Sequence, residues 1–426
     1  MNKTIITVLL CLLLSVSCAP HKNSTFTAEL ETNTLILNSQ PFFIKGINWS
    51  YSPIGTNYEY SLWAQPEKTI KAALDYDMAL LQNMGINTLR IYSGMPSKWI
   101  TYIYDNYGIY TVINHSFGRY GVMLNGTWNP YTDYGDSLTK EVLLEEVKAF
   151  ANQYKNTRGL LMFLLGNENN YGLFWEGGET EDIPTETSKY DQKAIDLYLL
   201  FNEAALAMKK LDTTHKIALC NGDLKYLDLI VEHCPDVDVL GINIYRGASF
   251  TGAFDDIKTK SDKPVMFTEF GGDAFNSIKM EEDQSAHAEY LLSNWKEIYE
   301  NTAGLGKAEN SIGGFTFQWS DGWWKTGQTI NLDKHDSTAS WTNGGYYHDF
   351  VKGKPNMNEE WFGICAKGKT LENGTYPLYP RAAYYILQEV NKLNPYHKDL
   401  TPEQLNDKFS KIKISEAREK AKLQPR

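Results

Sequence analysis

The chain has 426 residues, of which 42% are hydrophobic and 22% are charged, so it can bury a large core. Its net charge of −11 at pH 7 disfavours nucleic acid as a partner, because nucleic-acid binding needs a cationic face. The sequence has 27 Tyr, 18 Phe and 11 Trp. Many of these rings belong to the core, but this supply of Trp and Tyr also suits a protein that stacks rings against sugar faces.

Residues 1–20 are typical of a targeting segment. Lys3 precedes the apolar run TIITVLLCLLLSV, which is too short to span a bilayer. Two alternatives follow from SVSCAP. It resembles a lipobox, in which Cys18 would carry a lipid and anchor an exported protein in the periplasm, on the outer membrane or at the cell surface. Alternatively, cleavage occurs just before Cys18, with Ser15 and Ser17 as the small residues. Both alternatives predict export.

Short apolar runs alternate with amphipathic stretches from residue 42 onward. In chain order, the expected strands are 42–48, 86–92, 109–114, 160–166, 216–223, 237–245, 263–271 and 312–319, and the expected helices are 66–84, 96–107, 138–156, 189–211, a short helix after each of the fifth and sixth strands, 284–301 and 379–393. Such strict alternation implies a parallel sheet, and eight units predict a closed (β/α)₈ TIM barrel. The alternative is an open doubly wound sheet, but no glycine-rich phosphate loop follows the first strand.

The barrel is expected to occupy residues 42–395. Before it, 21–41 form an extension with a hairpin that turns at NSQP and plugs the barrel bottom. The connection after the eighth strand, about 320–376, is too long for a simple loop, and ordered loops of this length are usually functional. Residues 396–426 are a charged C-terminal tail rich in Lys and Glu.

Three cysteines lie beyond the targeting segment, at positions 220, 234 and 365. Helical sequence between Cys220 and Cys234 would separate their Cα atoms by ~15 Å, and a disulfide needs ~7 Å or less. All three are expected to be free, buried thiols.

Polar side chains close each expected strand, where a TIM barrel carries its active site. In strand order these residues are Asn48 and Trp49, Arg90 and Tyr92, Asn114 and His115, Asn167 and Glu168, Asn221 and Asp223, Asn243 and Tyr245, Glu269, and Gln318 and Trp319. Asn48, Tyr92 and His115 are candidate substrate-binding residues, although a structural hydrogen bond at a strand end is an equally good interpretation for His115. Asp321 and Trp324, just beyond the eighth strand, are candidates for an outer sugar subsite, with loop packing as the alternative.

Glu168 and Glu269 each end an apolar strand, and they are 101 residues apart (269 − 168), which is three βα repeats of about 34 residues. They therefore belong to the fourth and seventh strands, nearly across the barrel mouth. Two carboxyls facing each other over a sugar-sized cleft are what glycoside hydrolysis requires. The alternative, two independent solvated acids, does not account for their matching positions.

Other hydrolytic chemistries lack their motifs. The eight histidines include no His-x-His or His-Glu-x-x-His pair, which disfavours a metal site, and no Gly-x-Ser-x-Gly occurs. We therefore expect no cofactor and no metal. A catalytically inactive glycan-binding lipoprotein is the alternative outside the enzymes.

Several segments resemble glycoside hydrolase clan A. GNENN and FTEFGG, three strands apart, are similar to its acid/base and nucleophile motifs. QPFFIKGINW resembles the entry strand of family 2 and family 5 enzymes, and NEEWFGI and YPRAAYYIL resemble the end of family 2 barrels. GINTLRIYSGMPSKWITYIYDNYGIYTVI, YKNTRGLLMFLLGNENN and DVLGINIYRG are similar to fungal cell-wall β-1,3-glucanosyltransferases. The resemblance covers about 42–320 and 357–392.

This resemblance implies roles for individual residues. Glu168 would be the general acid/base and Glu269 the nucleophile, and Asn167 would bind the sugar 2-hydroxyl. Arg90 and Tyr245 would hydrogen-bond the nucleophile. In addition, Trp319 would form the floor of the cleaving subsite, and the peptide bond after it is a candidate non-proline cis bond.

The expected activity is a retaining β-glycosidase that cleaves a β-glucan-like polysaccharide or oligosaccharide through a covalent intermediate. The carboxyls should lie ~5–5.5 Å apart. A β-1,3 linkage is implied by the resemblance alone. RGASF and NHSFGRYG do not match the glucanosyltransferase loops, which leaves transglycosylation as the alternative to hydrolysis.

Overall fold

The computed structural model describes residues 26–92, 94–173 and 188–423. Residues 1–20, with Cys18, therefore lie outside the described residues. Among the described parts of the chain, no helix is both long enough and apolar enough to cross a membrane.

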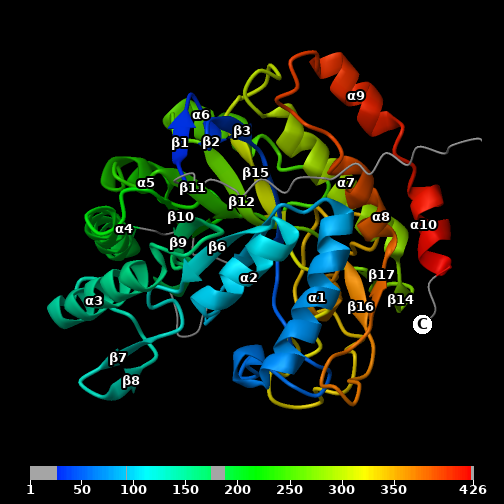
Figure 1. The fold of residues 1–426 in the computed structure, drawn as a ribbon, viewed down its shortest axis with the longest axis horizontal. Helices are drawn as coiled ribbons and strands as arrows, with labels where there is room; N and C mark the ends of the chain where they lie inside the picture. Colours follow the sequence, from blue (N-terminus) through cyan, green and yellow to red (C-terminus); the bar gives the residue numbers. More distant parts are fainter. Residues whose placement is uncertain (1–25, 93, 174–187, 424–426) are drawn as a thin grey trace, which may run out of the picture.

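Eight parallel strands close into a barrel, as predicted (Figure 1). Around the barrel they are β4 (Ile44–Asn48), β5 (Thr88–Ile91), β6 (Tyr110–His115), β9 (Leu160–Leu165), β10 (Lys216–Gly222), β11 (Val239–Asn243), β12 (Val265–Phe270) and β15 (Ser311–Thr316), which pairs with β4. Every residue of β9 is buried, because one face contacts the barrel interior and the other faces the helices. This is the burial that an apolar run without alternation indicates.

The barrel helices follow their strands in the expected order. They are α1 (Glu67–Met84), α2 (Ser97–Tyr107), α3 (Ser137–Tyr154), α4 (Ser188–Lys209), α5 (Leu227–His233), α6 (Ala253–Lys260), α7 (Gln284–Glu300) and α8 (Ala382–Val390). The Asp136 side chain accepts a hydrogen bond from the Thr139 N–H and so begins α3. Each helix buries its apolar face on the outside of the barrel.

A small sheet closes the bottom of the barrel. It has three antiparallel strands, β1 (Ala28–Glu31), β2 (Thr34–Leu37) and β3 (Gln40–Phe42). The structure therefore has one strand more than the two-stranded hairpin that was predicted. The predicted turn joins β2 to β3, and a second turn at Thr32–Asn33 joins β1 to β2. Ala28, Leu35 and Leu37 pack in one cluster with the barrel interior, as the plug prediction requires.

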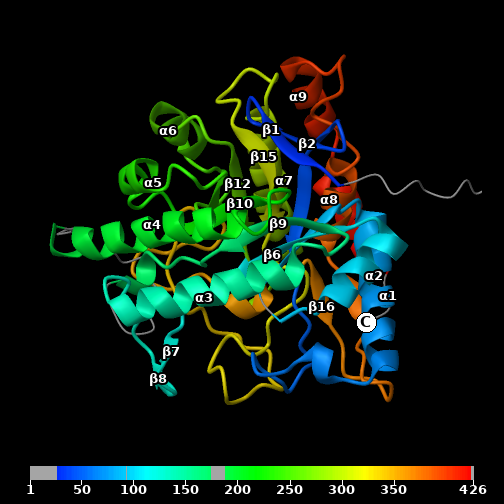
Figure 2. The same ribbon diagram turned by 60° about the vertical axis from the view of Figure 1, so that its left-hand side comes forward.

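The long connection after β15 lies at the opposite end of the barrel from this sheet (Figure 2). The short elements outside the barrel are η1 (Leu62–Ala64), β7 (Val122–Leu124), β8 (Thr127–Asn129), η2 (Tyr171–Leu173), β13 (Phe275–Asn276), β14 (Glu281–Glu282), η3 (Glu359–Trp361), β16 (Cys365–Lys367) and β17 (Leu378–Pro380). Within the connection, the His335 ring is stacked between Trp323 at 4.6 Å and Trp361 at 3.7 Å. The connection is therefore packed against itself.

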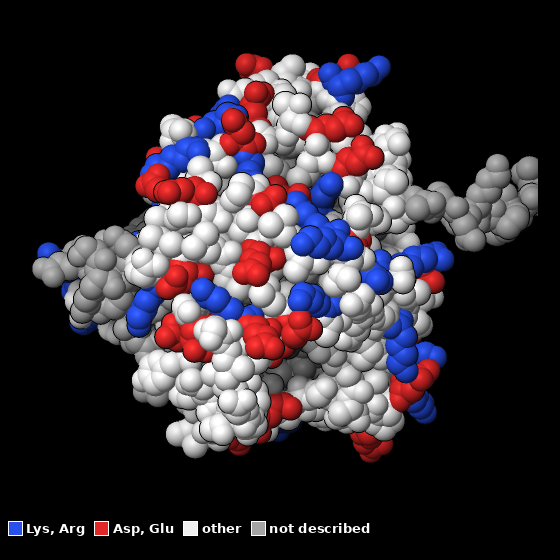
Figure 3. Space-filling view, turned by 90° about the vertical axis from the view of Figure 1, so that its left-hand side faces the viewer, with Lys and Arg blue, Asp and Glu red and all other residues white. Residues whose placement is uncertain are grey.

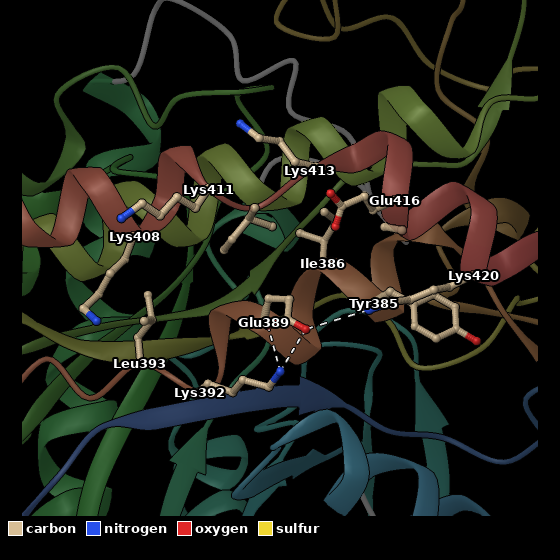
Figure 4. Close-up of a pocket in the computed structure, with 12 residues that line it drawn as sticks. Tyr385, Ile386, Glu389, Lys392, Leu393, Lys408, Lys411, Lys413, Glu416 and Lys420 are labelled. Atoms are coloured by element: carbon tan, nitrogen blue, oxygen red, sulfur yellow. Dashed lines mark hydrogen bonds and ion pairs between the residues drawn. The ribbon is translucent and has the colours of Figure 1, made fainter.

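The charged C-terminal segment forms two helices, α9 (Pro402–Ser410) and α10 (Ile414–Lys422). Leu405, Phe409 and Ala417 are buried in the main core cluster, so the segment is packed onto the barrel helices. With α8 these helices form a surface groove of about 380 Å³ (Figure 4). Its polar lining includes Lys392, which donates to both carboxylate oxygens of Glu389 at 2.8 Å. This groove lies on the outer side of α8.

Cys220, Cys234 and Cys365 are free and buried, as predicted. Burial raises the pKa of the Cys220 thiol to about 11 and that of Cys234 to about 12. Both thiols therefore stay protonated at neutral pH, which suits packing rather than nucleophilic chemistry.

One ionisable residue is buried between the barrel and α1. Asp77 is 1% exposed, and its Oδ2 accepts hydrogen bonds from the indoles of Trp49 at 2.9 Å and Trp319 at 3.0 Å. Burial raises the pKa of Asp77 from 3.8 to about 7, although the two indole N–H groups and the Lys367 charge oppose this shift. Folding therefore disfavours the ionised carboxylate.

Asp77→Asn should remove a pH dependence of stability. Because the folded-state pKa of Asp77 is raised, its protonated form stabilises the fold fully below about pH 4. That contribution is lost as the pH rises to about 7, at ~1.4 kcal/mol per unit. We expect the free energy of unfolding of Asp77→Asn, measured by urea titration, to fall less than that of the parent over this range. Asp262→Asn, whose side chain is 99% exposed, is the control. Parallel profiles for Asp77→Asn and the parent would contradict the prediction.

Candidate active site

Arg90, at the end of β5, is the centre of a buried polar cluster at the barrel mouth. The residue is fully buried. One guanidinium nitrogen, Nη1, donates to Glu269 Oε1 at 2.8 Å, and the other, Nη2, donates to Asn114 Oδ1 at 2.7 Å and Asn167 Oδ1 at 2.8 Å. The planar guanidinium can serve several acceptors in fixed directions. It thereby joins the ends of β5, β6, β9 and β12.

The Glu269 carboxylate is held by three donors. Besides Arg90, Tyr92 Oη donates to Oε1 at 2.7 Å and Tyr245 Oη donates to Oε2 at 3.0 Å. Burial raises the pKa of both phenols well above 10, and the Glu269 charge raises each of them further. Both tyrosines therefore remain protonated donors. Glu269 is 7% exposed, and its three donors hold the carboxylate in one orientation.

Glu168 is placed by a tight turn directly after β9. Gly166 and Glu168 both have left-handed backbones, with φ of 77° and 58°. Glycine tolerates this conformation, but for Glu it carries strain of the kind that often marks functional sites. The Glu168 N–H donates to the Cys220 carbonyl at 3.0 Å, which fixes the turn against β10. The side chain is partly exposed.

The amides beside Glu168 build this turn. Asn169 Oδ1 accepts from the Asn167 N–H at 2.8 Å, and Asn169 Nδ2 donates to the Phe117 carbonyl at 2.9 Å. Asn170 exchanges two hydrogen bonds of 2.8 Å with the Gly222 backbone. The polar sequence NENN therefore follows an apolar strand because its amides replace the backbone pairing that ends at Leu165.

Asn243, at the end of β11, contacts both Glu168 and the groups that surround Glu269. Its Nδ2 donates to Glu168 Oε1 at 3.0 Å, while its Oδ1 accepts from Thr268 Oγ1 at 2.8 Å and Arg90 Nη1 at 3.3 Å. Asn243 is among the strand-end residues expected from sequence, but no role was predicted for it. Tyr120 was also missed: its hydroxyl accepts from Asn167 Nδ2 at 3.0 Å. It comes from the loop after β6, where no strand-end pattern indicates it.

Two residues predicted to bind substrate, Asn48 and Tyr92, instead support Glu269. Asn48 is 1% exposed; its Oδ1 accepts from Tyr92 Oη at 3.1 Å and its Nδ2 donates to the Thr268 carbonyl at 3.0 Å. Tyr92 Oη in turn donates to Glu269 Oε1 at 2.7 Å. The hydrogen bonds from Arg90 and Tyr245 to Glu269 are those expected from the family resemblance.

The prediction that Trp319 forms a sugar-facing floor is wrong. Trp319 is fully buried, and its indole donates to Asp77 on α1, on the outer side of the barrel. Phe317, 7% exposed with its ring centroid 6.2 Å from that of Tyr245, is the ring on the site side. The cis peptide bond joins Phe317 to Gln318 and does not follow Trp319.

Asp321 and His115 also lie outside the site. Asp321 is fully buried, and its oxygens accept from Arg381 Nη1 and Nη2 at 2.7 Å each, so it anchors the long connection. His115 Nε2 is 3.6 Å from Glu146 on α3, and burial lowers its pKa to about 4. Adjacent strand residues face opposite sides, so Asn114 faces the site and His115 faces α3. This favours the structural alternative for His115.

Trp324 keeps a position compatible with its prediction. It is partly exposed, with its ring centroid 5.7 Å from that of Tyr58. Lys325 Nζ lies 5.1 Å from the Trp324 ring and 5.3 Å from the Phe317 ring, which places Trp324 beside the site. Within the described ranges, no cluster of three or more His, Cys, Asp or Glu could hold a metal ion.

Arg90→Met should destabilise the protein by about 3–5 kcal/mol, because it leaves the buried Glu269 charge without its partner. Arg90→Met/Glu269→Gln should lose clearly less stability than the sum of the two single variants, because neither charge remains. Urea unfolding followed by circular dichroism measures all four proteins of this cycle. Arg158→Met breaks an exposed pair with Asp105 and should cost under ~1 kcal/mol. A cost for Arg90→Met no larger than this control would show that the ion pair does not hold the site.

The chain is similar to curated glycan-active proteins. It is 26% identical over 279 residues to a Saccharomyces cerevisiae protein named "Probable 1,3-beta-glucanosyltransferase", covering 59% of this chain and 49% of that protein. It is 22% identical over 322 residues to a β-galactosidase of Actinobacillus pleuropneumoniae, covering 69% of this chain and 26% of that protein. The chain thus spans half or less of these relatives' lengths.

Solved structures and a family model agree on the barrel. The structure resembles a family 2 β-galacturonidase from Eisenbergiella tayi bound to galacturonate, with a TM-score of 0.54 and 14% identity, covering 87% of this chain and 55% of that one. At this identity the likeness shows the fold. The family model for the TIM barrel domain of glycosyl hydrolases family 2 matches residues 28–329, most of the chain. The chain therefore belongs to the family of the glycosyl hydrolases family 2 TIM barrel domain.

Proposed function

We propose that the protein is a retaining β-glycosidase that cleaves a β-glucan-like polysaccharide or oligosaccharide. The observation that carries this proposal is the different setting of the two glutamates at the barrel mouth. Glu269 is buried and held by Arg90, Tyr92 and Tyr245, which suits a nucleophile of fixed orientation. Glu168 is partly exposed and accepts from the neutral Asn243 amide, which suits a group that exchanges protons.

In the proposed first step, a Glu269 oxygen attacks the anomeric carbon and forms a glycosyl ester. Glu168 gives its proton to the glycosidic oxygen as the bond to the leaving sugar breaks. In the second step, Glu168 takes a proton from water, the water oxygen bonds to the anomeric carbon, and the ester to Glu269 breaks. Two inversions at one carbon give net retention, and we expect a carboxyl separation of ~5–5.5 Å.

The proposed substrate class is inferred from the similar proteins. A β-1,3 linkage is favoured by the similarity to a 1,3-β-glucanosyltransferase, and a polysaccharide would be met outside the cytoplasm, which suits an exported and lipid-anchored protein. Transglycosylation is the second candidate, because the same ester intermediate can pass to a sugar hydroxyl in place of water. The glucanosyltransferase relative favours it.

Glu269→Gln should lower kcat by at least ~10⁴-fold and Glu168→Gln by ~10²–10⁴-fold, because they remove the nucleophile and the proton donor. A 2-deoxy-2-fluoro β-glycoside should trap the ester on Glu269, as read by peptide mass spectrometry. Glu389→Gln on α8 is the control for a distant acid. If the first-formed product has the α anomer by NMR, or the label lies elsewhere, the retaining assignment fails.

Product length separates the two candidate activities. Residues 21–426 would be incubated with β-1,3-, β-1,4- and β-1,6-linked gluco-oligosaccharides and analysed by mass spectrometry, with Glu269→Gln as the blank. Products that are only shorter would show hydrolysis and identify the linkage. Products longer than the starting chain would show transglycosylation, and no change on any substrate would favour a glycan-binding protein.

A further inference from the structure

The β7–β8 hairpin, which follows β6, carries an exposed apolar surface at the active-site end of the barrel. In Figures 1 and 2 the hairpin projects beyond the barrel helices at the end opposite the β1–β3 sheet. Tyr120, just before β7, and Met123 and Trp128 on the two strands are 53%, 48% and 54% exposed, which is unusual for large apolar residues so close together. We call these three residues the hairpin platform.

Met123, Trp128 and Gly121 are neighbours in the structure. Met123 and Trp128 are directly paired across the two strands, so their side chains share one face of the hairpin. The Trp128 indole covers Gly121, where an added Cβ would lie 2.5 Å from Trp128 Cζ2. Gly121 is the neighbour of Tyr120 in the chain. Trp128 and Met123 therefore lie beside the backbone that leads from Tyr120 into the hairpin.

This surface begins at the catalytic residues. The Tyr120 hydroxyl accepts a hydrogen bond from Asn167 Nδ2 at 3.0 Å, and Asn167 immediately precedes Glu168. The base of the hairpin is tied to the same turn, because Asn169 Nδ2 donates to Tyr134 Oη at 2.8 Å and Tyr134 Oη donates to the Phe117 carbonyl at 3.0 Å. The platform is thus held in a fixed position relative to Glu168.

The platform lies beside the proposed acid and not beside the proposed nucleophile. A general acid protonates the oxygen of the departing sugar, so the leaving chain lies on the acid's side of the cleaved bond. An acceptor that attacks the ester enters by the same route, since the second step reverses the first. A chain leaving past Glu168 would meet Tyr120 first and Trp128 further out.

The chemistry of the surface suits neutral sugars. Arg119 is the single charged residue in 118–132, and it is 7% exposed. The active-site end of the molecule is mostly uncharged in Figure 3, whereas charged side chains gather over the rest of that face. Flat rings with exposed faces stack on the apolar faces of sugars, and the absence of an exposed Lys or Arg from residues 118–132 disfavours an anionic membrane as the occupant.

We propose that the hairpin platform binds the leaving-group or acceptor part of a β-linked glucan chain, outside the cleaving subsite. This inference rests on the proposed function, because it takes Glu168 as the acid. It assigns to Trp128 a stacking role on a sugar several units from the cleaved bond, and to Tyr120 the link between that sugar and the Asn167–Glu168 turn.

Binding to the inactive full chain tests the platform without relying on turnover. Glu269→Gln would be titrated calorimetrically with β-1,3-, β-1,4- and β-1,6-linked gluco-oligosaccharides of two to eight units. We expect affinity to rise with chain length for the preferred linkage. When Trp128→Ala is added to Glu269→Gln, the affinity for the longest chain should fall about tenfold. This loss of affinity should grow with the length of the oligosaccharide. Trp128→Phe, which keeps a ring, should retain most of it.

Leu199→Ala removes a 49% exposed apolar side chain from α4 and should leave binding unchanged. Equal affinities with and without Trp128, or no binding of any oligosaccharide, would overturn the platform. Trp128-dependent sedimentation with phosphatidylglycerol vesicles would also overturn it and assign the surface to a membrane. Product analysis of the wild-type protein is the separate test of catalysis. Trp128-dependent binding without any product would contradict the proposed enzymatic activity but not the platform. Products together with Trp128-independent binding would contradict the platform but not the enzymatic activity.

Discussion

The buried pair between Arg90 and Glu269 is the interaction on which the barrel mouth depends. Taking both charges out of water costs several kcal/mol per ion, and the structure offsets this cost only by giving each oxygen and nitrogen a partner. Arg90 therefore requires acceptors on three further strands, and Asn114, Asn167 and Asn243 supply them. Three of the amides at the strand ends thus serve one buried guanidinium.

The same constraint explains why the two glutamates differ. Glu269 receives charged and phenolic donors at the end of β12, whereas Glu168 lies in a left-handed turn, is partly exposed and accepts from the Asn243 amide. Asn243 contacts both environments through its two ends. A displacement of Asn243 would therefore affect both carboxylates together, although they lie on strands that do not pair with each other.

The barrel, its strand order and the two glutamates could be predicted from sequence because they depend on local patterns. An apolar run that stops at a polar residue identifies both the strand and its end, and eight such runs fix the topology. The wrong predictions concern residues whose role depends on contacts with residues far away in the sequence. Asp321 resembles a cleft acid until Arg381, 60 residues later, is placed against it. Trp319 lies three residues beyond the end of β15 at Thr316, so the alternation of that strand does not indicate which side its ring faces.

The long connection after β15 has an effect on the site that its sequence does not indicate. Tyr245, a donor to Glu269, is surrounded edge-on by three rings, with centroids 5.8 Å away for Phe362, 6.2 Å for Phe317 and 6.3 Å for Trp341. Phe362 and Trp341 belong to the connection, which is anchored by the ion pair of Arg381 with Asp321 and Glu282. Edge-to-face packing restricts the Tyr245 ring plane and so the direction of its hydroxyl. The ion pairs of Arg381 therefore anchor the connection whose rings pack against Tyr245, and Tyr245 in turn donates to Glu269.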